Sequence, residues 1–400
     1  MGSIYRVVGE NAHVLNASSG NVMTFKMTES EIRDLLQNWA DPKFELSEDV
    51  ASLFSVQTQM NTRLCRANLN NLGMEFGFPT IVNLELNRRC SMRCVHCYIG
   101  VERLASPLPS LFEQMTEEGL SHFLEEMREM GVFLLVFTGG EPFLNTRLEY
   151  LLESGREKGF VMELFSNLQH IPSWFLKKDP ISSMVGRIQV SVYSSDPAVH
   201  DRITTSQGSH QRSMDNLKEL QRRGFYVEVA TPLMKLNFDS WEDTKRVFGN
   251  LGVKQDFSWP IVDEYYSERL GKTSLNITAE QLGQFVEKNP DFLIRTEFGD
   301  PQSPVCEAGR SMFGVSANGD VFPCSQLPCP VGNTAKTSIR SIYESRGMQK
   351  FRDIKNVDTG LKEAYNFCMG ENFVETGNPL VQSQFILDLI GRSRKKGGVS

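Results

Sequence analysis

The stretch TIVNLELNRRCSMRCVHC, residues 80–97, joins an apolar strand to three closely spaced cysteines. Its residues 81–86 are the first of six near-continuous apolar runs; the others span residues 132–137, 160–165, 188–193, 226–231 and 254–259. Amphipathic helical patterns separate most of these runs, at residues 117–130, 147–158, 213–223 and 240–250. Apolar strands that alternate with helices indicate a parallel sheet with helical crossovers. Because six units are too few for a complete barrel, we expect a partial (β/α)6 TIM-like barrel or an open α/β sheet.

The composition of the chain is that of a folded globular protein. It has 400 residues, of which 40% are hydrophobic and 23% are charged. This length permits roughly two to four domains. The 42 basic and 49 acidic residues give a net charge of −7, which offers no electrostatic basis for a nucleic-acid partner. The absence of a long apolar run or a signal-peptide pattern predicts a soluble, cytoplasmic protein with no membrane partner.

The eight cysteines are distributed unevenly. One is isolated, three fall within eight residues, and four lie in the last quarter of the chain: Cys65; Cys90, Cys94 and Cys97; Cys306, Cys324, Cys329 and Cys368. In a reducing cytosol such groups indicate metal ligands or redox chemistry rather than disulfides. The group of three directly follows a predicted strand, where parallel α/β folds build their active sites. A structural zinc ion generally takes four protein ligands, whereas three cysteines on a four-iron cluster leave one iron open.

The spacing C-x3-C-x2-C of Cys90, Cys94 and Cys97 resembles the signature of radical S-adenosylmethionine (SAM) enzymes. One β/α unit later, the sequence TGGEP at residues 138–142 resembles that family's motif for the methionine amine of SAM, which implies that the cofactor is bound near Gly139, Gly140, Glu141 and Pro142. The resemblance implies a 4Fe–4S cluster on the three cysteines and a 5′-deoxyadenosyl radical made from SAM. The protein would then orient the substrate and exclude water.

The same resemblance implies further cofactor contacts at strand ends. His96 stands where the family often has an aromatic residue near the adenine. Ser166 and Asn167 close the third predicted strand, and Ser191 lies in the fourth; the family often uses polar groups there for the ribose and the methionine carboxylate. The alternatives are a surface histidine and ordinary caps or satisfied strand-end hydroxyls.

The C-terminal cysteines resemble a second family pattern. Cys306, Gly319 and Cys324 form C-x12-G-x4-C across a predicted hairpin, like the opening of SPASM and twitch domains, and Cys368-Met-Gly resembles a later part of that pattern. Tyr365 stands where a partner of Cys368 is expected, so the resemblance implies one auxiliary 4Fe–4S cluster on Cys306, Cys324, Cys368 and, as the uncertain fourth ligand, Cys329. Without Cys329 the cluster would have an open iron for a substrate thiolate. A zinc-stabilised hairpin made from these four residues is the alternative.

The first 75 residues read as a small βββααα unit with a winged-helix-like pattern. Strands are predicted at residues 4–8, 13–16 and 22–26, with a turn at 18–21. Thr28 and Glu31 form a capping box for the first helix; further helices are predicted after Ser47 and at 57–69. The unit resembles the PqqD-like recognition domain of enzymes that modify ribosomally made peptides. That resemblance implies a leader peptide added as a strand beside residues 22–26.

These patterns predict five segments: a peptide-recognition domain at 1–75, a radical SAM barrel at 76–265, a linker at 266–300, an iron–sulfur domain at 301–375 and a tail at 376–400. The predicted function is that of an oxidoreductase which installs a thioether or carbon–carbon crosslink in a precursor peptide. Its partners would be that peptide with its leader and a one-electron donor such as flavodoxin or ferredoxin. The alternatives are a peptide epimerase, a radical SAM enzyme for a small molecule or folded protein, and a non-catalytic peptide-binding scaffold.

Overall fold

The computed structural model describes residues 3–16, 21–38, 62–99, 109–179, 185–261, 275–292, 295–297, 300–361, 363–365, 367–382, 384 and 387–388. The predicted helix after Ser47 and residues 18–20 of the predicted turn lie outside these ranges, as does most of the predicted C-terminal tail. Within the described ranges no helix combines the length and apolarity that a membrane span requires.

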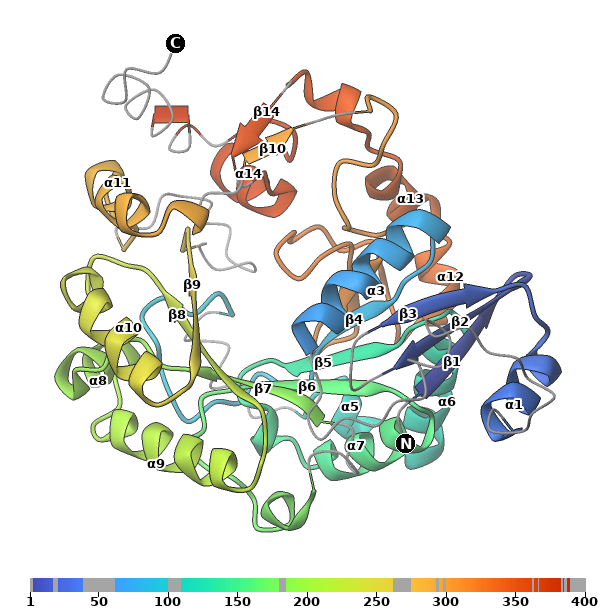
Figure 1. The fold of residues 1–400 in the computed structure, drawn as a ribbon, viewed down its shortest axis with the longest axis horizontal. Helices are drawn as coiled ribbons and strands as arrows, with labels where there is room; N and C mark the ends of the chain where they lie inside the picture. The colour runs from blue at the N-terminus through green and yellow to red at the C-terminus, as the bar shows by residue number, and fades with distance from the viewer. Residues whose placement is uncertain are drawn as a thin grey trace.

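A curved parallel sheet forms the centre of the molecule (Figure 1). Its six consecutive parallel strands are β4 (Ile81–Glu85), β5 (Leu134–Thr138), β6 (Val161–Ser166), β7 (Val185–Ser191), β8 (Val227–Pro232) and β9 (Lys254–Ser258). The connecting helices are α5 (Leu111–Gln114), α6 (Glu117–Glu129), α7 (Leu148–Glu157), α8 (Pro197–Thr204), α9 (Ser209–Arg222) and α10 (Trp241–Asn250), most of them on the convex side. The prediction of a partial (β/α)6 barrel is confirmed.

The C-terminal region extends this sheet. The predicted hairpin consists of β11 (Met312–Val315) and β12 (Asp320–Phe322), followed by β13 (Gly332–Asn333). Strand β11 also pairs in parallel with β4, which gives a nine-stranded sheet in the order β13-β12-β11-β4-β5-β6-β7-β8-β9. Beyond it lie α11 (Ala279–Lys288), α12 (Ile339–Tyr343), α13 (Arg346–Arg352), α14 (Met369–Thr376) and the pair β10 (Arg295–Glu297) and β14 (Glu363–Tyr365). The hairpin therefore extends the sheet from the edge of β4 that is not paired with β5, and the C-terminal cysteines lie in this extension.

The N-terminal unit has its own antiparallel sheet. It contains β1 (Ser3–Val8), β2 (Asn11–Asn16) and β3 (Val22–Phe25), followed by α1 (Glu29–Asn38) and α3 (Thr62–Phe76). The predicted capping box is present, because Thr28 N donates to Glu31 Oε2 at 2.8 Å and Glu31 N donates to Thr28 Oγ1 at 3.3 Å. Helix α3 packs into the main core with Cys65, Leu69 and Leu72, so it contacts the barrel as closely as it contacts its own sheet.

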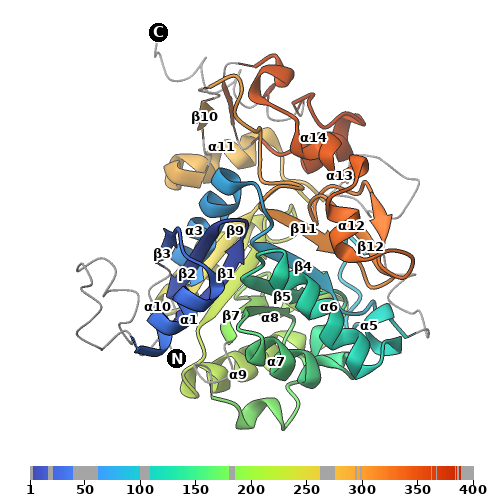
Figure 2. The same ribbon diagram turned by 90° about the vertical axis from the view of Figure 1, so that its right-hand side faces the viewer.

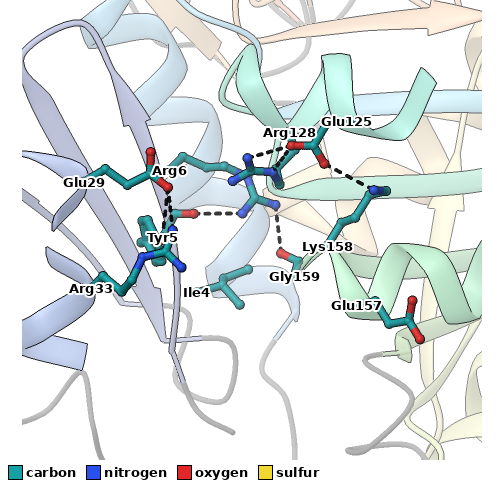
Figure 3. Close-up of a pocket in the computed structure, with 10 residues that line it drawn as sticks. All are labelled: Ile4, Tyr5, Arg6, Glu29, Arg33, Glu125, Arg128, Glu157, Lys158 and Gly159. Carbon is teal, nitrogen blue, oxygen red and sulfur yellow. Dashed lines mark hydrogen bonds and ion pairs between the residues drawn. The ribbon is translucent and has the colours of Figure 1, made fainter. Parts of the chain in front are cut away.

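Figure 2 shows the N-terminal sheet, β1 to β3, beside the barrel strands. Arg6 fastens this sheet to the barrel (Figure 3). Its guanidinium donates to Val132 O at 2.7 Å and to Gly159 O at 2.8 Å, and it lies over the rings of Phe133 and Phe160. These residues precede β5 and β6. The N-terminal unit is therefore docked at the end of the barrel opposite to the carboxyl ends of the strands.

Candidate active site

The loop after β4 carries three half-buried cysteines, namely Cys90, Cys94 and Cys97. The backbone N–H groups of Arg93 and Val95 donate to Thr204 O and Ile203 O, at 3.1 and 3.0 Å. These bonds tie the loop to the end of α8. The cysteines therefore have a fixed place at the carboxyl end of the sheet, where ligands bind in α/β folds.

The thiols of this loop fit an iron–sulfur cluster. Burial, with smaller effects from neighbouring thiolates, raises the pKa of Cys90 to about 11 and that of Cys94 to about 12. Thiols with raised pKa values ionise when they coordinate a bound cation, which deprotonates coordinating thiols. Among the described residues no three Cys, His, Asp or Glu side chains converge on a single metal ion. A single zinc ion would hold each sulfur at about 2.3 Å, whereas a cluster of several atoms spreads its ligands.

Two side chains from neighbouring strands contact the cysteine sulfurs. Asn167, just after β6, donates from Nδ2 to Cys90 Sγ at 3.4 Å. The Tyr193 hydroxyl lies 3.8 Å from Cys94 Sγ. Hydrogen bonds to cluster sulfurs shift the reduction potential, so both residues would tune a cluster held by these cysteines. Asn167 was predicted as a cofactor contact. Tyr193 was not predicted, and the only signal for it was its place at the end of an apolar run.

The glycine-rich segment after β5 packs against the cysteine loop. Gly140 N donates to Asn87 O, and Glu141 N donates to Arg89 O, both at 2.8 Å. A Cβ atom at Gly140 would come within 3.0 Å of Arg89 O, and one at Gly139 would come equally close to Asn87 O. Gly139 also has a φ of 126°. The glycines thus let two backbone segments meet beside the cysteines.

A Gly140→Ala variant is expected to bind SAM more weakly. Its methyl group must displace the backbone at Arg89, next to Cys90. Overpacking of this kind costs about 1–3 kcal/mol, which corresponds to about a ten- to hundredfold loss of affinity. Equilibrium dialysis with reconstituted protein measures the effect. Gly249→Ala in α10, where an added Cβ meets nothing within 4 Å, is the control and should bind SAM normally.

Glu141 connects the glycine-rich segment to the end of β6. Its carboxylate accepts from Ser166 Oγ and Asn167 N, both at 2.8 Å, and from Phe143 N at 3.1 Å. Burial raises the pKa of Glu141 to about 7, although these donors favour its ionised form. Ser166 Oγ also accepts from Leu168 N at 2.9 Å. The hydroxyl of Ser166 is thus used within the protein, and its role toward SAM stays a prediction. Pro142 is the first residue of a short 3-10 turn.

Aromatic rings stack behind the cysteine loop. His96 packs edge-on against Tyr193, with ring centres 4.6 Å apart, and Tyr193 stacks on His200 at 5.3 Å. Burial lowers the pKa values of His96 and His200 to about 4, so both are neutral at pH 7. The buried Nδ1 of His96 has no hydrogen-bond partner. Ser191 lies within hydrogen-bonding reach of the Tyr193 phenol. The predicted residues His96 and Ser191 therefore meet around Tyr193.

The C-terminal cysteines form a second group. Burial raises the pKa of Cys306, and the charges of Cys324 and Cys368 add to that effect. The pKa of Cys329 is raised by burial alone, although this residue packs on the same apolar cluster. Cys368 is the N-cap residue of α14, but its side chain makes no capping hydrogen bond. Burial, and then the charge of Glu371, raise the pKa of Cys368 to about 12. Three of the four predicted ligands are thus coupled, and ligation by Cys329 stays a prediction.

The two cysteine groups lie toward opposite ends of the sheet. Strand β11 runs parallel to β4, and β12 runs back antiparallel to β11. Cys324 therefore leaves β12 toward the end where β4 begins, whereas Cys90 follows the end of β4. A small cavity between them is lined by residues of β4, β5 and the hairpin, including Asn83, Thr138 and Ser325.

Comparison with known proteins identifies both regions. Residues 84–248 match the radical SAM superfamily, and residues 306–369 match the SPASM iron–sulfur cluster-binding domain. The chain thus contains a radical SAM domain and a SPASM domain. It is an enzyme whose cofactors are SAM and iron–sulfur clusters. When bound, SAM and its cluster supply a 5′-deoxyadenosyl radical.

Individual relatives are more distant. The chain is 22% identical to an AdoMet-dependent heme synthase of Methanosarcina barkeri, over 77% of this chain and 96% of that protein. It is 26% identical to the subtilosin biosynthesis protein AlbA of Bacillus subtilis, over 72% of this chain but only 64% of AlbA. The structure of SuiB from Streptococcus suis bound to its precursor peptide SuiA has the same fold, with a TM-score of 0.62, 14% identity, and coverage of 96% of this chain and 98% of SuiB.

Proposed function

We propose that this enzyme joins two side chains of a ribosomally made precursor peptide by a thioether or carbon–carbon bond. The observation that carries the proposal is a groove of about 540 Å³ between β3 and α3, in the same chain as the radical SAM site. It is lined by Asn21, Val22, Met23, Thr24, Asn68, Asn71, Leu72, Glu75 and Phe76. AlbA, a bacteriocin biosynthesis protein, and SuiB, which was captured with a precursor peptide, support the assignment.

The groove has the form that strand addition requires. In the described part of the N-terminal sheet β3 is an edge strand, so it offers backbone N–H and C=O groups to another chain. Leu72 and Phe76 of α3 give the groove an apolar wall, and Phe76 is 39% exposed. A leader peptide with alternating apolar residues would pair with β3 and place those side chains against α3. Residues 1–75 are thus proposed as the recognition domain.

The cofactor sites are assigned to the two cysteine groups. Cys90, Cys94 and Cys97 are proposed to hold the cluster that binds SAM, with Gly139, Gly140, Glu141, Asn167 and His96 around it. Cys306, Cys324 and Cys368 are proposed to hold the auxiliary cluster, with Cys329 as the candidate fourth ligand. The auxiliary cluster would supply an acceptor for the surplus electron of crosslink formation. A cytoplasmic flavodoxin or ferredoxin is the proposed reductant.

The direct test is co-expression with the short peptide encoded beside the gene, followed by mass spectrometry. A crosslink lowers the peptide mass by two hydrogen atoms. An unchanged mass with D-residues would instead identify an epimerase, and an unmodified peptide would contradict the proposal.

A Phe76→Ser variant is expected to bind the leader about tenfold more weakly, because it removes most of the exposed apolar wall of the groove. Burial of a phenylalanine side chain contributes about 1.5–3 kcal/mol, and about 1.4 kcal/mol corresponds to a tenfold change in affinity. Fluorescence anisotropy with a labelled leader peptide measures this affinity. Val357→Ser is the control, since Val357 is also exposed but lies in the C-terminal region. If Phe76→Ser and the wild type bind the leader with equal affinity, the leader binds outside this groove.

A small-molecule substrate is the second candidate, because the chain aligns with 96% of the length of a heme synthase. That alternative gives the β3–α3 groove no role in catalysis. This alternative predicts that the enzyme modifies no peptide. A peptide with its leader and one without it would both remain unmodified.

A further inference from the structure

Four charged side chains form a continuous buried network inside the barrel. Arg187 on β7 donates to Glu163 of β6 at 2.6 Å and to Glu228 of β8 at 2.9 Å. Arg66 of α3 donates to the same Glu163 Oε2 at 2.8 Å. The side chains of Glu163 and Glu228 are 0% and 1% exposed, whereas that of Arg66 is 25% exposed. A helix of the N-terminal region therefore reaches an ion pair in the barrel core.

Helix α3 has two functional faces. Asn68, Asn71, Leu72 and Glu75 line the leader groove. Because successive helical residues are about 100° apart, Arg66 lies roughly 180° around the helix from Glu75. A peptide bound in the groove thus contacts the same helix that carries Arg66, on the side opposite to the Arg66–Glu163 ion pair.

We propose that Arg66 is a positioning residue which couples the leader groove to the substrate site inside the barrel. This inference rests on the proposed function. The Arg66–Glu163 pair is an ion pair between α3 and β6, in addition to the apolar packing of α3. It holds α3 in one position relative to β6, and a leader bound against α3 favours that position. The substrate part of the peptide then meets an ordered barrel interior.

The strand that carries Glu163 leads toward the cysteine loop. Glu163 lies on β6, whose end carries Asn167, the donor to Cys90. Glu163 Oε1 has no hydrogen-bond partner, so the position of this carboxylate depends on the two arginines at Oε2. A substitution at Arg66 is therefore expected to change the affinity for the core peptide in the barrel.

The test is a pair of binding measurements, because coupling between two ligands is reciprocal. The affinity of a labelled leader peptide for the reconstituted holoenzyme is measured without and with a saturating leaderless core peptide. We expect the core peptide to tighten leader binding at least about fivefold in the wild type. In Arg66→Met this ratio falls to about one, while the leader affinity measured alone stays within about twofold. Arg66→Lys, which keeps the charge, retains part of the ratio.

Arg33→Met is the matched control, because Arg33 pairs with Glu29 on the exposed surface of the same unit. It should keep the full ratio. An unchanged ratio in Arg66→Met would overturn the inference; if that variant does not fold, Arg66→Gln decides by the same ratio. A wild-type ratio of one, with full-length precursor still crosslinked, overturns the coupling and leaves the proposed function standing. A wild type that modifies no precursor contradicts both.

Discussion

A Cys90→Ala variant is expected to form no 5′-deoxyadenosine above the uncatalysed background, even with a strong chemical reductant. Cys90 is one of three thiols in the loop after β4, and its sulfur accepts hydrogen bonds from Asn167 Nδ2 and Met92 N at 3.4 Å. Its loss removes a proposed cluster ligand and leaves these donors without an acceptor. Chromatography of anaerobic reactions, together with iron and sulfide analysis, measures the effect.

Cys65→Ala is the control for this prediction. Cys65 is 1% exposed and lies in the apolar core, and burial raises its pKa to about 12. It is an ordinary buried thiol, so its removal should leave the iron content and the yield of 5′-deoxyadenosine unchanged. Full turnover by Cys90→Ala would show that the cluster assignment is wrong. Reconstituted wild-type protein that contains zinc and no inorganic sulfide would show the same.

The local sequence pattern was sufficient to predict the barrel strands and the place of the cysteine loop. A near-continuous apolar run identifies a strand that is buried on both faces, and β4 through β6 are buried along almost their entire length. Strand β9 differs, because its residues alternate between exposed and half-buried positions. It is the last strand on its side of the sheet, so fewer side chains cover it. The position of the cysteines then followed from the end of the first strand.

Contacts between residues far apart in the sequence could not be predicted from a local pattern. The pairing of β11 with β4 joins Met312 to Ile81, and nothing near either residue signals it. A charged residue within a strand usually faces solvent, so Glu163, Arg187 and Glu228 gave no sign of a buried network. Arg66 and Glu163 are 97 residues apart in the chain. Tyr193 was missed for the same reason, since its contact with Cys94 depends on how two loops meet.

The buried network makes a strong prediction about stability. Arg187→Met is expected to destabilise the protein by about 3–5 kcal/mol, because it leaves two buried carboxylates, Glu163 and Glu228, without the cation between them. Urea denaturation of the apoprotein measures this as a lower midpoint. Arg246→Met is the control: Arg246 and Asp243 form an exposed pair, 66% and 69% accessible, and its loss should change stability by less than about 0.5 kcal/mol.

A second substitution separates charge repulsion from lost packing. If uncompensated carboxylates cause the loss, then Glu163→Gln in the Arg187→Met background should recover part of it, although Glu163→Gln alone should destabilise the protein. The two substitutions would then be non-additive, as expected for residues in direct contact. Purely additive effects would mean that Arg187 contributes only through its apolar contacts, such as that with the ring of Phe165. In that case Arg187 would stabilise the barrel by packing rather than by its charge.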